Sequence, residues 1–136
     1  MKIDTLKKEL SGAIEALIIS VSGFKQKLSG GMIEPSELLK KYYLFADHLI
    51  SHIQKLDNIL LVINEDIQKA DKLNNPKDVQ LFGTVLDSAV EIRKLCEDFF
   101  SSAERDIEAK QMEPFRLGNH AELLLRKLVL CKNSLI

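Results

Sequence analysis

The sequence predicts an all-α protein: an antiparallel up-down-up-down four-helix bundle with a long central helical hairpin and coiled-coil-like packing. Apolar residues recur at alternating steps of three and four over long stretches, a spacing that places them on one face of a helix. Pro35, Pro76 and Pro114 each lie in a gap between such stretches and divide the chain into four segments. No segment alternates apolar and polar residues as a strand does, so no sheet is expected.

The size and composition of the chain fit one domain, residues 1–136. Hydrophobic residues make up 46% and charged residues 29%, which is an ordinary balance for a globular protein. A chain of 136 residues is long enough to bury a hydrophobic core without disulfides or metals. We therefore expect a single helical-bundle domain.

The first helix is predicted from about Ile3 to Ser29. The Gly30-Gly31 pair ends it, because glycine adopts the left-handed conformation of a helix cap without steric cost. The apolar face of this helix carries Leu6, Leu10, Ile14, Leu17, Val21, Phe24 and Leu28.

The second helix is predicted from Pro35 or Ser36 to about Leu73. Proline suits the first helical position, where its missing N–H would have no partner in any case. Asp57-Asn58 could indicate a break, but the apolar pattern continues through both residues in register, so one helix is predicted. Its seam is typical of a coiled coil and contains Leu39, Tyr42, Ala46, Leu49, Ile53, Leu56, Leu60, Ile63, Ile67 and Ala70.

The third helix is predicted after the turn at residues 74–76, with Asn75 as its N-cap, and runs to about Met112. Because a tight turn joins the two long helices, they should pack antiparallel. The seam of the third helix contains Phe82, Val85, Ala89, Ile92, Cys96, Phe99 and Ala103. The core of the hairpin is expected to bury Ile53, Leu56, Leu60, Phe82, Ala89, Ile92, Cys96 and Phe99.

The fourth helix is predicted over residues 120–135, after a gap that contains Pro114 and Gly118. Asn119 followed by Glu122 resembles a capping box, in which the two side chains bond free backbone N–H groups at the start of a helix. This helix is short and apolar nearly all round.

The charge balance and the cysteines exclude several classes of function. Lysine and arginine total 19 and aspartate and glutamate 20, whereas nucleic-acid binders usually carry a basic excess, so no nucleic-acid partner is expected. No stretch approaches the roughly 20 apolar residues of a membrane span, and the charged N-terminal segment does not resemble a secretory signal. Cys96 and Cys131 lie on apolar faces, which favours buried thiols in a reducing cytoplasm.

Two histidines form a weak candidate for a metal site. His48 and His52 lie four residues apart on the second predicted helix, a spacing that can bring two imidazoles to one metal ion. A site needs further ligands, and the chain holds no second histidine pair. We therefore predict neither a metal nor a cofactor, and expect His48 to face outward and His52 to flank the seam.

Arg116 and His120 lie near the predicted start of the last helix. HEPN-type helical ribonucleases carry an arginine a few residues before a histidine near the start of a late helix, and this pair resembles that motif. The resemblance covers these two residues and the order of the helices, and the spacing is shorter than in the motif. It implies, as an alternative function, a small ribonuclease or toxin that uses Arg116 and His120.

The predicted helix lengths leave part of the central hairpin uncovered. At about 1.5 Å per residue the two central helices reach roughly 55 Å, against roughly 40 Å for the first helix and roughly 24 Å for the fourth. Neither flanking helix should cover the stretch from about Ile63 to about Asp87, although this stretch is rich in apolar residues. The predicted interface residues are Leu61, Val62, Ile67, Leu81, Phe82, Val85 and Leu86.

Large exposed apolar surfaces on proteins usually mark interfaces. The sequence therefore predicts a homodimer formed through the hairpin, or a helical protein partner that binds in the same place. No catalytic motif accompanies this surface. The favoured function is a non-enzymatic cytoplasmic interaction module: an adaptor, an assembly factor or a chaperone-like helical bundle.

Overall fold

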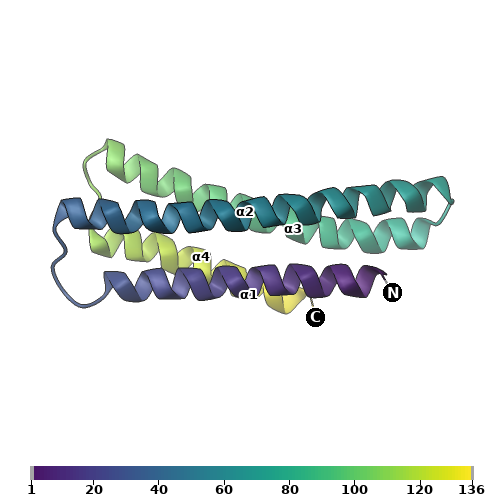
Figure 1. Ribbon diagram of the computed structural model, residues 1–136, viewed down its shortest axis with the longest axis horizontal. Coiled ribbons are helices and arrows are strands. Elements are labelled where there is room, and N and C mark those ends of the chain that lie inside the picture. Colours follow the sequence, from purple (N-terminus) through teal and green to yellow (C-terminus); the bar gives the residue numbers. More distant parts are fainter. Residues whose placement is uncertain (1, 136) are drawn as a thin grey trace.

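The computed structural model describes residues 2–135 and consists of four helices joined by short connections (Figure 1). Helices make up 89% of it, and the described residues contain no strand. The prediction of an all-helical bundle is confirmed. The helices are α1 (Lys2–Leu28), α2 (Pro35–Lys72), α3 (Pro76–Glu108) and α4 (Pro114–Ser134).

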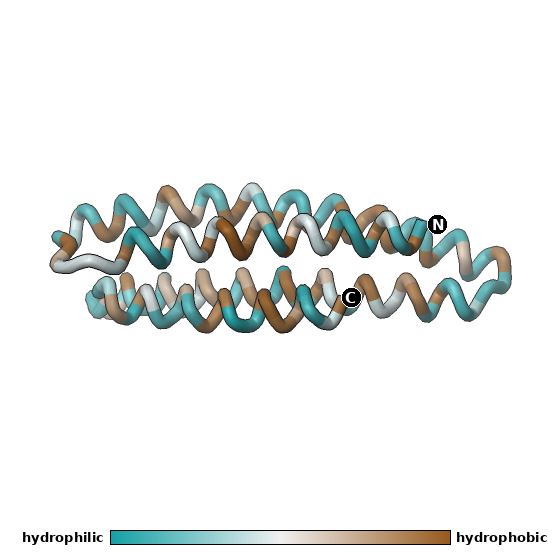
Figure 2. The backbone as a smooth tube through the Cα atoms, turned by 90° about the horizontal axis from the view of Figure 1, so that it is seen from below, coloured by the Kyte–Doolittle hydropathy of each residue, from teal (hydrophilic) through white to brown (hydrophobic). Residues whose placement is uncertain are grey.

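Each helix packs beside the helices that precede and follow it in the chain, and α1 also packs beside α4. The core lies between the four helices and is built from the apolar face of each. The far ends of α2 and α3 extend past both chain ends, so the tip of the hairpin stands apart from α1 and α4 (Figures 1 and 2).

The apolar face predicted for α1 is buried as expected. Every one of its seven predicted residues is buried, because the spacing of three and four keeps them on one side of the helix. Gly30 and Gly31 follow the helix with φ angles of 112° and 124°, which confirms that glycine ends it by leaving the helical region.

In α2 the prediction of one continuous helix is confirmed, but part of the predicted seam is wrong. Ile53 and Leu60 are only partly buried, although both were expected in the core. Because α2 contacts α1 as well as α3, its buried face is not a single stripe against one partner. Leu38 and Phe45 are buried near its start, and they lie outside the predicted seam.

The predicted start of the fourth helix is also wrong. α4 begins at Pro114, six residues earlier than predicted, and Gly118 lies inside it. Pro114 occupies the first turn, where a proline needs no backbone hydrogen bond, so it marks the beginning of the helix rather than a gap. Glu122 makes no capping bond and instead accepts hydrogen bonds from Lys25 and Arg126.

The hairpin turn follows the predicted chemistry. The side chain of Asn75 accepts a hydrogen bond from the backbone N–H of Asp78 at 3.3 Å, which caps α3. Asn74 adopts a φ of 52°, a left-handed conformation that asparagine tolerates better than most residues. Among the described residues, no helix combines the length and apolar character needed to cross a membrane.

Candidate functional site

The outer part of the α2–α3 hairpin, residues 61–86, is the surface on which the predicted interface lies, and we call it the hairpin arm. Two contacts show where the flanking helices stop. The ammonium group of Lys2, at the start of α1, lies 3.0 Å from the carboxylate of Asp66. Near the end of α4, burial raises the pKa of the Cys131 thiol, and the nearby charge of Glu91 on α3 raises it further. The tip of the arm therefore lies beyond both flanking helices. This agrees with the uncovered stretch that the helix lengths predicted.

The structure divides the seven predicted interface residues into three groups. Leu61 and Val62 are exposed, Leu61 for 62% of its surface. Ile67, Leu81 and Leu86 are partly buried against the core. Phe82 and Val85 are buried within a single chain.

The burial of Phe82 and Val85 changes what a partner could touch. These residues belong to the buried face of α3 and to the core that the four helices share, so no second chain is needed to bury them. Leu73, which the sequence did not mark as an interface residue, is 79% exposed next to the turn. The apolar surface that the arm offers is therefore Leu61, Val62 and Leu73, flanked by the partly buried residues.

A second cluster of functional side chains joins the end of α3 to the start of α4. Arg116 donates two hydrogen bonds to the buried carboxylate of Asp106, one from Nη2 at 2.8 Å and one from Nε at 3.2 Å. Nε2 of His120 lies 2.8 Å from Oδ2 of the same carboxylate. The hydrogen bond from Arg116 holds the pKa of Asp106 below its usual range, because it stabilises the charged form and outweighs the effect of burial.

The structure thus brings the side chains of Arg116 and His120 together, and both of them contact the carboxylate of Asp106. Both oxygens of Asp106 are engaged, and each of the two basic side chains is turned toward it. A ribonuclease site needs these side chains free to meet a phosphodiester in an open cleft. The cavity beside His120 measures about 40 Å³ and has largely apolar walls from α3 and α4, and Arg116 does not line it.

Sequence reasoning missed the role of Asp106. It lies three residues after Ala103, at the next seam position of α3, on a face that is otherwise apolar. A buried carboxylate requires a charged or hydrogen-bonding partner, because desolvation of an unpaired charge is costly. An acidic residue in an apolar seam was therefore a signal that Asp106 is paired in the core. The seam does not show which side chain pairs with it.

His48 and His52 lie on α2 as predicted, the first exposed and the second partly buried. Nε2 of His52 lies 2.9 Å from the hydroxyl of Ser20 on α1. Burial lowers the pKa of His52, and the positive charges of Lys55 and His48 lower it further. Within residues 2–135 no group of three or more histidine, cysteine, aspartate or glutamate side chains is placed to hold a metal ion.

We predict that the purified protein carries no stoichiometric transition metal. Two histidines without a third ligand bind metal ions too weakly to survive purification. Elemental analysis of the untagged protein measures this directly, with His48→Ala as the comparison. About one zinc or iron per chain, lost in that variant, would show that the histidine pair is a metal site.

The two cysteines do not have the surroundings of a reactive thiol. Burial raises the pKa of Cys96 to about 12. Burial also raises the pKa of Cys131, which is partly exposed on α4. Because the thiolate is the nucleophile, both residues are poor candidates for covalent catalysis.

No protein-family model, no curated protein and no solved structure matches this chain. The function of this chain must therefore be inferred from its own surfaces and side-chain clusters.

Proposed function

We propose that this chain is a non-enzymatic protein–protein interaction module that self-associates as a two-fold dimer through its hairpin arm. In this proposal the four helices alternate in direction, as an antiparallel bundle with coiled-coil-like packing, and the arms of two chains pair across the two-fold axis. Such a protein would act in the cytoplasm as an adaptor, an assembly factor or a chaperone-like bundle.

The observation that carries the proposal is the exposure of apolar side chains on the hairpin arm. Leu61 and Leu73 expose 62% and 79% of their surface, and Val62 lies beside Leu61. Past Asp66, where α1 begins, the arm is a pair of helices, which buries one stripe of each helix and leaves the other faces in water. Contact with a second arm would remove these side chains from water, which is the main driving force of association.

The charges of the arm are compatible with pairing between identical copies. Asp71 and Lys72 precede the turn, and Lys77 and Asp78 follow it. A two-fold axis brings the same surface of both chains together, so a surface of mixed sign can pair opposite charges, whereas a surface of one sign would repel its copy. A helix from a different protein could occupy the same place, and the mass measurement below separates the two cases.

We expect the double substitution Leu61→Glu with Leu73→Glu to convert a dimer into a monomer. The new carboxylates would have to be buried without partners in a dimer, whereas in a monomer they remain in water. Light scattering after size-exclusion chromatography at high micromolar concentration should show the mass of two chains for the native protein and of one chain for the variant.

The matched control is Leu123→Glu, because Leu123 on α4 is 54% exposed and lies about two helical turns farther from the arm than Cys131 does. It should leave the dimer intact. All three substituted positions are exposed, so the helical content by circular dichroism should not change. A native protein that stays monomeric at these concentrations, or a dimer that survives both arm substitutions, contradicts the proposal.

A further inference from the structure

An open groove lies between α1 and α2, at the end of the molecule where the two helices are connected. It has a volume of about 490 Å³, within the usual range of small-molecule sites. Its lining spans Ile19 to Lys27 on α1, which corresponds to roughly 12 Å along the helix axis. The groove is separate from the hairpin arm and from the Asp106 cluster.

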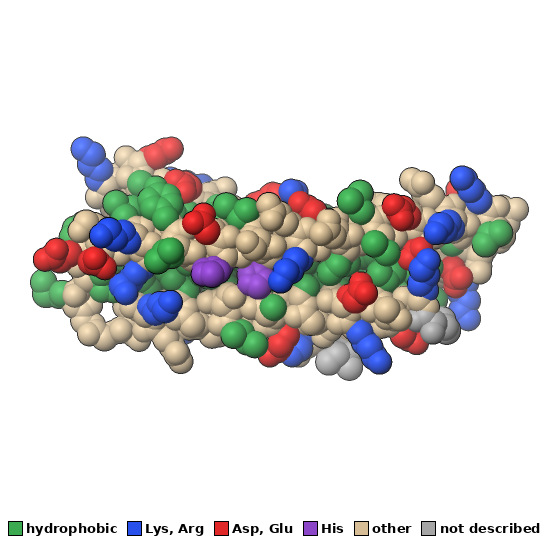
Figure 3. Space-filling model, viewed as in Figure 1, with side chains coloured by type: hydrophobic (Ala, Val, Ile, Leu, Met, Phe, Trp, Pro, Cys, Tyr) green, Lys and Arg blue, Asp and Glu red, His purple; other side chains and the backbone are tan. Residues whose placement is uncertain are grey.

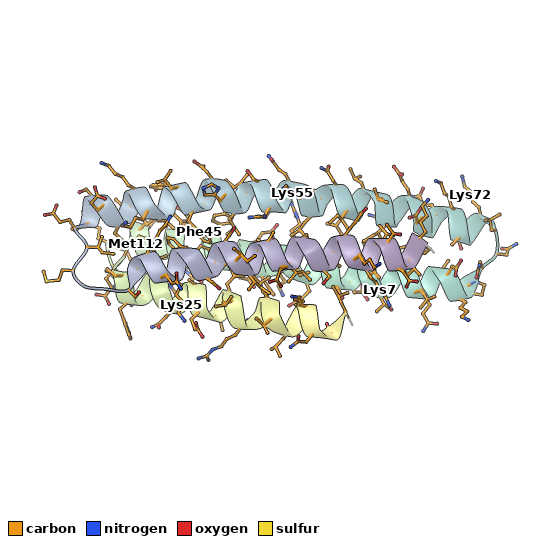
Figure 4. All side chains as sticks on the ribbon, turned by 60° about the horizontal axis from the view of Figure 1, so that its bottom comes forward. Lys7, Lys25, Phe45, Lys55, Lys72 and Met112 are labelled. Carbon is orange, nitrogen blue, oxygen red and sulfur yellow. The ribbon has the colours of Figure 1, made fainter. Side chains whose placement is uncertain are left out.

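Two stacked aromatic rings line the groove at its base. The rings of Phe24 and Phe45 are parallel within 4°, with their centroids 4.1 Å apart. Figure 4 shows Phe45 pointing from α2 toward α1. Phe45 also contacts Phe99 edge-on at 5.5 Å, so this base is fixed by packing into the core.

The walls of the groove are apolar and uncovered. Ile19 on α1 and Leu44 on α2 line it from the two sides, and each exposes 64% of its surface. Between them, Gly23 lies in the interior of α1, where glycine weakens a helix relative to alanine. A Cβ atom at Gly23 would meet nothing within 4 Å, so packing within this chain does not require glycine there. A side chain at this position would take up space that the groove leaves open.

The charged residues of the groove are all basic. Lys27 and Lys41 line it together with His48, and no aspartate or glutamate does. Across the interface of α1 and α4, Lys25 of α1 pairs with Glu122, and Lys132 of α4 pairs with Glu15. By contrast, within the part of the chain that the structure describes, neither Lys27 nor Lys41 has an ion-pair partner.

The surface around the groove carries charges of both signs, so the basic character belongs to the residues that line the groove. Figure 3 shows this face of the molecule, with histidine side chains along the boundary of α1 and α2, lysine or arginine side chains on both sides of them, and aspartate or glutamate side chains farther from the boundary. Unpaired cations beside an apolar groove attract a ligand that has an anionic group next to an apolar body.

We propose that this groove binds a small amphiphilic carboxylate of the medium-chain fatty-acid class. The apolar chain would lie over Phe24 and Phe45, between Ile19 and Leu44, and the carboxylate would lie between Lys27 and Lys41. A docked helix would need a row of apolar anchors over several turns, whereas the exposed apolar residues here are one on each side. The length and volume of the groove fit a single short chain.

Isothermal titration with decanoate tests the proposal, at concentrations below micelle formation. Decyltrimethylammonium has the same chain with a cationic head group and serves as the ligand control. We expect saturable binding of one decanoate per chain, and binding of the cationic amphiphile weaker by about tenfold or more, because the two lysines attract one head group and repel the other.

Two pairs of variants separate the charge from the shape of the groove. Lys27→Gln with Lys41→Gln should weaken decanoate binding by about tenfold or more, whereas Lys69→Gln with Lys72→Gln, the same charge change on the hairpin arm, should not. Gly23→Leu should block binding by filling the groove. Gly12→Leu is the matched control, since Gly12 is the other glycine within α1 and its Cβ would also meet open space.

Helical content by circular dichroism should be the same in all these variants, since each replaces an exposed or partly exposed residue. Three results would overturn the proposal. They are the absence of saturable decanoate binding, equal affinity for the anionic and cationic amphiphiles, and decanoate binding that persists in both the lysine pair and Gly23→Leu.

Discussion

Replacing Ile92 with alanine is expected to lower the free energy of unfolding by about 2–5 kcal/mol. Ile92 lies in the middle of α3 and exposes 0% of its surface. The substitution removes apolar atoms from the core and leaves a cavity, because helices packed on several sides cannot close it fully. Urea denaturation followed by far-ultraviolet circular dichroism measures the change.

Val90→Ala is the matched control for this experiment. Val90 lies two residues earlier on the same helix and is 51% exposed, so both substitutions truncate a β-branched residue to alanine in one helix. The control should change the free energy of unfolding by no more than about 0.5 kcal/mol. Equal losses in the two variants would mean that Ile92 is not in the core.

The seam of α3 shows how far apolar spacing alone can predict a helix face. All seven residues predicted for it are buried, from Phe82 to Ala103. These residues follow one another at alternating steps of three and four along the whole buried face. The alternating steps of three and four were therefore enough to identify the buried face of α3, and the same holds for α1.

The pattern fails in α2 because two different faces of that helix carry apolar residues. Leu38 and Phe45 are buried near its start, while Ile53 and Leu60 lie at the edge of the core farther along. When the apolar residues of α2 are assigned to one seam, the assignment cannot show that the buried face of the helix is wider where a second helix packs against it. The seam gives the spacing of buried residues but not the number of helices that cover them.

The candidate sites depend on contacts between residues far apart in the sequence, so little of them could be predicted. Exposed apolar residues on the hairpin arm followed from helix lengths, but the sequence placed Phe82 both in the core and in the interface, and the structure buries it. The α1–α2 groove combines Lys27 and Lys41 from two helices, and neither stands out in the sequence. Arg116 and His120 could be noticed as a pair, whereas their common contact with Asp106 depends on how α3 and α4 meet.

Asp106→Asn is expected to lower the free energy of unfolding by about 1.5–3 kcal/mol at neutral pH, the usual range for hydrogen bonds to a charged group. The substitution keeps the shape of the side chain but removes the charge that both Arg116 and His120 contact. Arg116 is exposed, so water can solvate it after the change, and the loss should be smaller than for a fully buried pair. Asp87→Asn, at an exposed position of the same helix, is the control and should have little effect.

The pH dependence of this loss tests its electrostatic origin. The hydrogen bond from Arg116 lowers the pKa of Asp106 in the folded protein, so the carboxylate stabilises the fold above its unfolded pKa of about 3.9. That stabilisation is lost as the pH falls through the folded pKa, because the protonated carboxyl then resembles the asparagine amide. Urea denaturation of both proteins should therefore give a difference that is constant near neutral pH and shrinks below about pH 4. A difference that persists unchanged into acid would mean that Asp106 stabilises the α3–α4 junction by its shape rather than by its charge.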